Sequence, residues 1–389
     1  MKAEHEMTDV RMSAETASKL RECARGVSRI DTAPRGLALS RLPEWTYLQH
    51  AHAPIVAKVA ERLSGAHFEI ETSADRIAVR YRSLRDSAPA VNWIAGPTTI
   101  AVTTDDYESS VSHSNGDLRV WAGEEVAEFI EGEDSIAEFV LPASSVPRNV
   151  TIWLPQNCPV EVIDLETNAS WQPVRELSKP LWIHYGSSIS HCEDASGPLG
   201  VWPVAAARAL GLEIYNLGLA GGANLEQFAA RTIRDLPADL ISLKLGINVV
   251  NGANLTERTF GPAVHGFIDT IRDGHPTAPI LVISPICCPA HENNPGPSSS
   301  TADGQVAGQE FGPHTWIGEL TLRGIREILK DLVRARSVAD PHIFYMDGLQ
   351  LFDEVEALTM PDGIHPDAAG YDVIAKNFIA RYPREWYSH

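Results

Sequence analysis

The fold of the second half of the chain is decided by the stretch PLWIHYGSSIS (180–190), in which a short apolar run ends in a glycine and two serines. Four similar runs follow it: LEIYNLG (212–218), DLISLKLG (239–246), PILVISP (279–285) and HIFYMDG (342–348). A strand of a parallel sheet is covered on both faces, so its sequence is apolar at nearly every position. The five runs therefore predict five buried strands.

Helical segments separate these runs: WPVAAARALG (202–211), ANLEQFAARTIRDL (223–236), TERTFGPAVHGFIDTIRD (256–273) and WIGELTLRGIREILKDLVRARS (316–337). Strands that alternate with helices predict a parallel sheet with helices on both faces. We therefore expect a three-layer α/β domain at residues 179–389.

The residues before this domain have a different pattern. From about residue 46 to 178, short segments alternate apolar and polar residues between turn residues, as in HFEIETSADRIAVRYRS (67–83), TTIAVTTDDYES (98–109), EFVLPASS (138–145) and NVTIWLPQNCPVEVIDLE (149–166). A period of two residues at this spacing predicts an antiparallel β-sandwich or jelly roll. We expect residues 1–45 to be a helical or irregular lead-in.

One segment of the C-terminal half fits neither pattern. It is CCPAHENNPGPSSSTADGQVAGQEFGPH (287–314), which is rich in Gly, Pro, Ser and Asn. A loop of this length inside a compact domain is usually functional or mobile. Because it leaves the carboxyl end of the fourth predicted strand, we expect it to border the functional site.

Composition excludes several classes of partner. The chain of 389 residues has a formal net charge of −19, which disfavours binding to phosphate backbones and anionic membranes. No apolar run is long enough to span a bilayer, and the N-terminal sequence has no apolar core of a secretory signal. The five cysteines have the spacing of neither a disulfide framework nor a metal knuckle. We expect a soluble, cytoplasmic protein without nucleic-acid or membrane partners.

Polar residues and glycines follow the predicted strands at their carboxyl ends, where open α/β sheets bind ligands. YGSSIS (185–190) follows the first strand, NLGLAGGAN (216–224) the second and LGIN (245–248) the third. PDGIHPDAAGY (361–371) comes after the fifth strand and places Asp362 three residues before His365. Pro366 is expected to open a terminal helix.

These groups together suit ester chemistry. A serine hydroxyl becomes nucleophilic when a histidine takes its proton, and a carboxylate can orient that histidine. Donors directed at the developing oxyanion usually supply the largest catalytic contribution. The sequence offers the N–H of Ser188, a glycine N–H between residues 218 and 222, and the amide of Asn248. Each feature alone is explained by a helix cap or a turn, but their order at successive strand ends favours one joint site.

The ordered set resembles the SGNH (GDSL) hydrolase superfamily over residues 180 to 385. The motifs that carry the resemblance are GSSI (186–189) in place of GDSL or GDSI, NLGLAG (216–221) for N-x-x-x-x-G, GIN (246–248) for G-x-N and DGIHP (362–366) for D-x-x-H-P. The resemblance implies a flavodoxin-like three-layer α/β/α sheet, with Ser188 as nucleophile, His365 as base and Asp362 as its orienting residue. It also implies an oxyanion hole formed by Ser188, Gly221 and Asn248. We expect no cofactor and no metal ion.

The sequence departs from the family pattern at two positions. Ser187 replaces a frequent aspartate, and Val249 replaces the aspartate that often follows the asparagine, but neither position supplies the functional atoms of the motifs. Ser190 stands where a G-x-S-x-G elbow would have its second glycine, which argues against an ordinary α/β-hydrolase. The preceding β-region resembles the arrangement of some carbohydrate esterases and natural-product acyltransferases of the superfamily.

Three functions are consistent with these observations. The first is a serine esterase that hydrolyses O-acyl esters of a small molecule or glycoside through an acyl-enzyme. The second is an acyltransferase that passes the acyl group to a hydroxyl of a natural product or sugar, and the third is a binding protein without catalysis. We expect hydrolysis rather than transfer, because water needs no dedicated site. The sequence does not indicate the oligomeric state.

Two further features have competing interpretations. His184 and residues 191–194 (His, Cys, Glu, Asp) form a dense patch beside Ser188, for which pocket lining is expected rather than metal binding because helical or knuckle spacing is absent. Trp residues at 45, 93, 121, 153 and 171 could stack on a sugar, but in a sandwich we expect most of them in the core.

Overall fold

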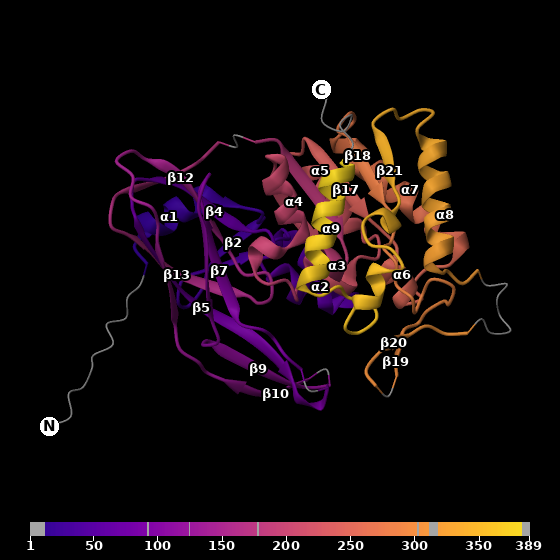
Figure 1. Ribbon diagram of the computed structural model, residues 1–389, viewed down its shortest axis with the longest axis horizontal. Helices are drawn as coiled ribbons and strands as arrows, with labels where there is room; N and C mark the ends of the chain where they lie inside the picture. Colours follow the sequence, from indigo (N-terminus) through magenta and orange to yellow (C-terminus); the bar gives the residue numbers. More distant parts are fainter. Residues whose placement is uncertain are drawn as a thin grey trace.

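The computed structural model describes residues 12–91, 93–123, 125–176, 179–301, 303–310 and 318–382. Figure 1 shows the N-terminal strands side by side with the parallel sheet and its helices. Parts of several predicted segments lie outside the described residues: the start of the lead-in, the end of the predicted β-region, the end of the long loop, the start of the helical segment 316–337 and the end of the C-terminal domain. The predicted domain boundaries at 45/46 and 178/179 therefore stay predictions.

Two largely antiparallel sheets form the N-terminal part. One has the strand order β1-β4-β12-β7-β8 with β14 beside β4, and the other has the order β10-β9-β5-β13-β3-β2 with β6 and β11 beside β5. Alternate side chains of both sheets, among them Phe68, Val79 and Val150, form one buried core, which confirms the predicted β-sandwich. The strand bounds are β4 His67–Thr72, β5 Arg76–Ala88, β6 Trp93–Ile94, β7 Thr98–Thr103, β8 Glu108–His113, β9 Asp117–Ala122, β10 Glu125–Ile130, β11 Ser135–Val140, β12 Arg148–Trp153, β13 Val160–Thr167 and β14 Trp171–Pro173.

The first 60 residues differ from the expectation. The lead-in contains one helix, α1 (Ala14–Cys23), but it also forms three short strands that join the sandwich, β1 (Ala24–Arg25), β2 (Arg29–Thr32) and β3 (Leu37–Ser40). Two helices, η1 (Glu44–His52) and α2 (Pro54–Ala60), then occupy the start of the predicted β-region. Strands of two to four residues are too short to show a period, so tertiary pairing decides them.

Five parallel strands form the sheet of the C-terminal part. They are β15 (Leu181–Gly186), β16 (Glu213–Gly218), β17 (Leu240–Lys244), β18 (Ile280–Ile283) and β21 (Ile343–Met346), in the order β16-β15-β17-β18-β21. This is the flavodoxin-like order 2-1-3-4-5, which confirms the expected fold class. The chain reverses direction across the sheet between β15 and β17, and ligands bind at such a switch point in open α/β sheets.

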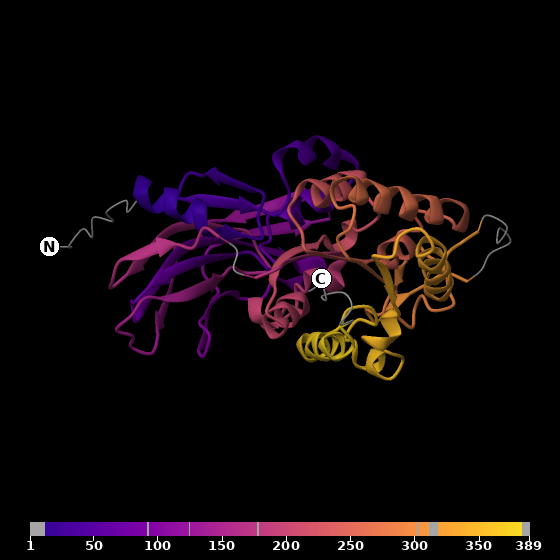
Figure 2. The same ribbon diagram turned by 90° about the horizontal axis from the view of Figure 1, so that it is seen from above.

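Helices cover both faces of this sheet. Trp182 of β15 stacks on Phe378 of α9 at a ring distance of 5.1 Å, whereas Tyr185 of the same strand contacts Phe267 of α7 on the other face at 5.0 Å. In Figure 2, the yellow α9 and the salmon α7 accordingly lie on opposite sides of the sheet. The bounds of the helices are α3 Ser188–His191, α4 Trp202–Leu210, α5 Gln227–Asp235, α6 Ile247–Asn251, α7 Glu257–Gly274, α8 Leu322–Arg336 and α9 Ala368–Arg381.

The terminal helix begins later than Pro366 suggested. Asp367 is the N-cap of α9, and its side chain accepts a hydrogen bond from the N–H of Gly370. A carboxylate at the N-cap accepts a hydrogen bond from a free N–H of the first turn. A proline side chain has no acceptor for such a bond. None of the helices in the described ranges is long and apolar enough to cross a membrane.

A buried ion pair joins the sandwich to the parallel sheet. His67 begins β4 and Glu213 begins β16, and His67 Nε2 lies 2.8 Å from Glu213 Oε1 with both side chains at most 6% exposed. Burial alone would lower the pKa of His67 and raise that of Glu213. The mutual attraction of the pair outweighs burial, so the pKa of His67 is raised and that of Glu213 is lowered.

We expect Glu213→Gln to lower the free energy of unfolding by about 3 kcal/mol in urea titrations, because it removes the hydrogen-bonded counter-charge of His67 and leaves only the more weakly coupled Glu69 near it. The His67 contribution is present below its ordinary range near 6.5 and is lost as pH rises through the raised pKa. The Glu213 contribution is present above about 4.3 and is lost as pH falls through the lowered pKa. The difference in free energy of unfolding between wild type and Glu213→Gln should therefore shrink as the pH rises through the raised pKa of His67 and as it falls through the lowered pKa of Glu213. A constant difference from pH 4 to 9 would contradict the ion-pair assignment.

Candidate active site

Three residues that are far apart in the sequence form one chain of hydrogen bonds. Ser188 Oγ lies 2.9 Å from His365 Nε2, and His365 Nδ1 lies 2.6 Å from Asp362 Oδ2. If His365 donates its Nδ1–H to the carboxylate, Nε2 is free to accept the proton of the serine. The side chains of His365 and Asp362 are 34% and 39% exposed, so the pair lies at the surface of the site.

The two adjacent serines have different environments. Ser188 is the first residue of α3, directly beyond the carboxyl end of β15, and it is partly exposed. Ser187 is only 1% exposed, and its Oγ accepts a hydrogen bond from the N–H of Ile189 at 3.3 Å as the N-cap of the helix. The structure thus directs Ser188 towards His365 and Ser187 towards the backbone.

Asp362 is held in its ionised form. Its Oδ1 accepts hydrogen bonds from the N–H groups of Ile364 at 2.9 Å and His365 at 2.7 Å. Burial would raise the pKa of Asp362, but the hydrogen bonds from the ring and backbone of His365 outweigh it and lower the pKa to about 2. The carboxylate therefore keeps its negative charge beside the imidazole at every pH above about 3.

The long loop supports the segment that carries Asp362 and His365. Val306 N donates to the carbonyl of Asp362 at 3.0 Å, and Cys288 Sγ donates to the carbonyl of Gly363 at 3.4 Å. Val306 belongs to a small hairpin within the loop, formed by β19 (Ser299–Ser300) and β20 (Val306–Ala307). The described part of the loop thus borders the site.

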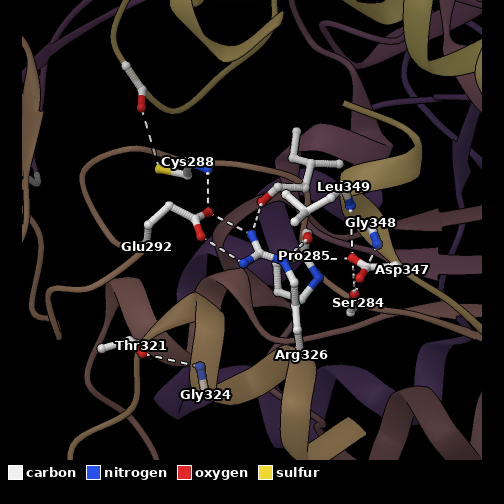
Figure 3. A network of polar contacts seen from close by, with 12 residues as sticks. Ser284, Pro285, Cys288, Glu292, Thr321, Gly324, Arg326, Asp347, Gly348 and Leu349 are labelled. Atoms are coloured by element: carbon white, nitrogen blue, oxygen red, sulfur yellow. Dashed lines mark hydrogen bonds and ion pairs between the residues drawn. The ribbon is translucent and has the colours of Figure 1, made fainter. Parts of the chain in front are cut away.

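A second network fixes the start of this loop (Figure 3). Arg326 of α8 directs its guanidinium fork at Glu292, with Nη1–Oε2 and Nη2–Oε1 distances of 2.7 and 2.6 Å. The same guanidinium donates to the carbonyls of Pro285 and Ile286 just beyond β18. Glu292 Oε1 also accepts from the N–H of Cys288 at 3.1 Å, so the fork indirectly supports the candidate base.

The structure also brings the candidate oxyanion donors together. Asn248 of α6 accepts a hydrogen bond at Oδ1 from the N–H of Ala223 at 3.2 Å, and Ala223 follows the turn that contains Gly221. This bond leaves the amide N–H₂ of Asn248 available for a ligand. A Cβ atom built on Gly221 would meet no atom within 4 Å, so open space lies beside this part of the turn.

One positioning residue was overlooked in the sequence. Asn216, the first residue of the NLGLAG motif, donates from Nδ2 to the carbonyl of Ser190 and to Ser64 Oγ, both at 2.9 Å. Its Oδ1 accepts from the N–H of Gly218 at 3.0 Å. The side chain therefore connects α3 to the end of β16. The asparagine at the first position of the motif is the sequence signal for this contact.

A partly buried carboxylate holds the far end of the same turn. Glu226 Oε2 accepts from the N–H of Asn224 at 2.9 Å and from the hydroxyl of Tyr185 at 3.2 Å. Burial raises the pKa of Glu226. Ala220 and Leu225, at the two ends of this turn, have φ angles of 49° and 64°, which non-glycine residues adopt at a cost of about 1 kcal/mol or more. These contacts therefore stabilise a strained turn.

Three of the five residues in the patch beside Ser188 are buried, whereas Glu193 is partly exposed and Asp194 is exposed. His184, His191 and Cys192 are all 0% exposed, which corrects the expectation that they contact a substrate. His184 lies between two hydroxyls, with Nε2 2.7 Å from Ser190 Oγ and Nδ1 2.6 Å from Ser242 Oγ. The single turn of α3 packs on the sheet, so these side chains point inward. Of the tryptophans at 45, 93, 121, 153 and 171, Trp153 and Trp171 are buried, Trp45 and Trp121 are partly buried and Trp93 is exposed, so the expectation that most lie in the core is wrong.

Metal-compatible side chains lie elsewhere in the described part of the chain. His67, Glu69 and Glu213 form the one group there whose ligand atoms all lie within 4.8 Å of one another. They are at the amino-terminal end of β16, opposite the edge that carries Ser188. The ion pairs His67–Glu213 and Arg25–Glu69 account for this cluster.

The fold and the site together define an α/β domain with a hydrogen-bonded serine, histidine and aspartate at the carboxyl edge of a parallel sheet. Residues 184–373 match the family of GDSL-like lipases/acylhydrolases, and this part of the chain is a GDSL-like lipase/acylhydrolase domain. No curated protein sequence matches the chain.

Solved structures are similar over nearly the whole chain. The salicylyl-acyltransferase SsfX3 from a tetracycline biosynthetic pathway is 26% identical, with a TM-score of 0.72 over 91% of this chain and 92% of that one. A putative GDSL-like lipase from Bacteroides ovatus is 18% identical, with a TM-score of 0.61 over 93% and 94%. An active-site mutant of a family two carbohydrate esterase from Clostridium thermocellum is 13% identical, with a TM-score of 0.56 over 92% and 98%. The last two similarities show the fold alone.

Proposed function

We propose that the protein is a serine-dependent esterase that hydrolyses O-acyl esters of a small molecule or glycoside. The observation that carries this proposal is the hydrogen-bonded chain from Ser188 through His365 to Asp362. Ser188 attacks the acyl carbonyl while His365 Nε2 accepts its proton. Asp362 keeps the ring in the required tautomer and stabilises the imidazolium that forms.

The oxyanion of the tetrahedral intermediate is held by the N–H groups of Ser188 and Gly221 and by the amide of Asn248. Collapse of the intermediate releases the alcohol, which takes the proton from His365, and leaves an acyl-enzyme on Ser188. Water then attacks the acyl-enzyme with His365 again acting as base. The partial exposure of His365 supports hydrolysis, because solvent has access to this side of the site.

The direct test is turnover of p-nitrophenyl acetate together with covalent labelling by a fluorophosphonate. A hydrolase should show both activities, and the label should reside on Ser188 in mass spectra of peptides. If the folded protein shows neither activity, the alternative of a non-catalytic binding protein stands.

An acyltransferase is the second candidate, and one observation favours it. The similarity to the salicylyl-acyltransferase combines higher identity with a higher TM-score than the similarity to the carbohydrate esterase. In a transferase the acyl-enzyme is intercepted by a hydroxyl group of a sugar or natural product. The two candidates are separated by product partitioning with an activated acyl donor and a panel of alcohols. Acylated acceptor in excess of free acid would replace the hydrolase with the transferase.

We expect Asn248→Ala to lower kcat by about 10²–10³ with a much smaller effect on KM, because the amide acts mainly in the transition state. Asn248→Asp keeps an acceptor for Ala223 N but removes the N–H donor, so its loss of kcat should be at least as large. Asn251→Ala is a matched control on the same helix. A large rise in KM with unchanged kcat would instead make Asn248 a substrate-binding residue.

A further inference from the structure

Arg41 is a buried cation at the end of β3, in the part of the chain that precedes the catalytic-domain match. Its side chain is 0% exposed, and all five of its N–H donors have acceptors. The acceptors are Arg62 O at 2.7 Å from Nε, Asn216 O at 2.7 Å and Gly218 O at 2.9 Å from Nη1, and Val59 O at 2.7 Å and His191 Nδ1 at 3.2 Å from Nη2.

These acceptors belong to three segments that meet beside the candidate oxyanion hole. Asn216 and Gly218 end β16, immediately before the turn that contains Gly221. His191 ends the single turn of α3 that begins with Ser188. One guanidinium therefore contacts both the helical turn that begins with Ser188 and the motif that contains Gly221.

The third segment reaches the same turn by packing. Val59 belongs to α2, and Val56 on that helix lies against Gly222, where a Cβ atom would come within 2.3 Å of Val56 Cγ2. Close approach of α2 to the turn thus requires glycine at this position. Arg41 links this N-terminal helix to the turn through the carbonyl of Val59.

The charge of Arg41 is not neutralised within the described residues. Four of its acceptors are carbonyl groups and the fifth is a ring nitrogen, and no carboxylate pairs with it there. Burial lowers the pKa of Arg41 to about 9, which still leaves it charged at neutral pH. Burial also lowers the pKa of His191, so the ring is neutral and neither neutralises nor repels the charge of Arg41. An unneutralised charge acts strongly in a buried environment of low dielectric constant.

We propose that Arg41 is a positioning residue for the oxyanion hole and that its unneutralised charge favours the anionic tetrahedral intermediate. This inference rests on the proposed function. The guanidinium fixes the carbonyl groups of Asn216 and Gly218 and the ring of His191, and thereby the relative placement of the Ser188 and Gly221 N–H groups. Its role is exerted through these groups, since it has no exposed surface with which to touch a substrate.

The first test compares Arg41→Lys with Arg82→Lys. Lysine keeps the charge but has three donors in place of the five-donor fork. We expect Arg41→Lys to lower kcat by about 10²-fold, the effect of a small displacement of reacting groups, with less than about threefold change in KM. Arg82 is also buried, but its side chain pairs with Asp117 and Asp134 within the sandwich, so Arg82→Lys should leave kcat within about threefold of wild type.

The second test changes the electrostatic environment while keeping Arg41, and it remains decisive if Arg41→Lys does not fold. His191→Asn retains a neutral acceptor for the guanidinium, whereas His191→Asp supplies a carboxylate that neutralises it. We expect kcat of His191→Asp to be at least about tenfold below that of His191→Asn. Affinity for a boronic acid, which forms an anionic tetrahedral adduct, should fall in parallel. Affinity for a neutral substrate-analogue amide should differ little between the two variants.

The outcomes separate this inference from the proposed function. If wild-type protein neither turns over esters nor reacts with a fluorophosphonate, the proposed function fails first. If wild type is active, equal kcat and equal boronic-acid affinity in the two His191 variants would refute the electrostatic role. Unchanged kcat in a folded Arg41→Lys variant would refute the positioning role.

Discussion

Ser188→Ala is expected to abolish labelling by a fluorophosphonate and to lower kcat by about 10⁴–10⁶-fold, while Ser187→Ala keeps kcat within about tenfold of wild type. The reason is the geometry of the two serines. Only Ser188 Oγ lies at hydrogen-bonding distance from His365 Nε2, at 2.9 Å, whereas Ser187 is buried and caps α3. Loss of the nucleophile removes covalent catalysis and leaves only the oxyanion donors and binding.

Ser187→Ala is the matched control for this prediction. It removes an N-cap hydrogen bond, so a decrease of about 1 kcal/mol in the free energy of unfolding is expected in urea titrations. Ser188→Ala should therefore lose kcat, whereas Ser187→Ala should lose stability and keep most of its kcat. A label that mass spectrometry places on Ser187 would show that the motif has been read in the wrong register, and the whole site assignment would then be lost.

His365→Ala should lower kcat by about as much as Ser188→Ala does, because a nucleophile and its base act as a unit. Asp362→Asn should lower kcat by about 10⁴-fold while leaving KM nearly unchanged. An amide facing His365 Nδ1 donates rather than accepts, so it favours the tautomer whose Nε2 carries the hydrogen. That nitrogen cannot then accept the proton of Ser188.

Asp362→Ala is the comparison that isolates the tautomer effect. It also loses the hydrogen bonds to the N–H groups of Ile364 and His365, but a carbonyl group or water can still orient the ring, so we expect a smaller loss of kcat. Because the pKa of Asp362 is lowered to about 2, its charge is constant above pH 3 and should produce no limb in the pH–rate profile there. If the wild-type profile has a limb above pH 3 that Asp362→Asn abolishes while His365 is retained, the low pKa of Asp362 is contradicted.

The strands and catalytic motifs were accessible from the sequence because they depend on local patterns. Five apolar runs predicted the parallel strands to within one or two residues at most ends, since a strand buried on both faces is apolar throughout. The ordered motifs selected Ser188, Asn248, Asp362 and His365, and the structure places the first and last of these at hydrogen-bonding distance. Their roles stay proposals until the variants are measured.

Elements that depend on distant partners were not accessible. β9 and β10 form a hairpin at the edge of a sheet, and every described residue of β10 is exposed, so no alternation marks them. The strands β1, β2 and β3 are short: β1 and β3 pair with the longer strands β4 and β13, and β2 pairs in turn with β3. The sequence predicts that His191 lines the pocket beside the nucleophile, but the packing of α3 buries it.

The sequence by itself determined the fold class of the C-terminal domain, the family to which it is similar and the candidate catalytic side chains. Periodicity and motif spacing suffice for these because each is written in a contiguous stretch. Only the tertiary structure decided which groups support them. Arg41 and Ser64 act on Asn216 across more than 150 residues, and Arg326 reaches the loop beside Asp362 through Glu292. No local pattern records such contacts, because a buried polar side chain is identified only by the partners that folding brings to it.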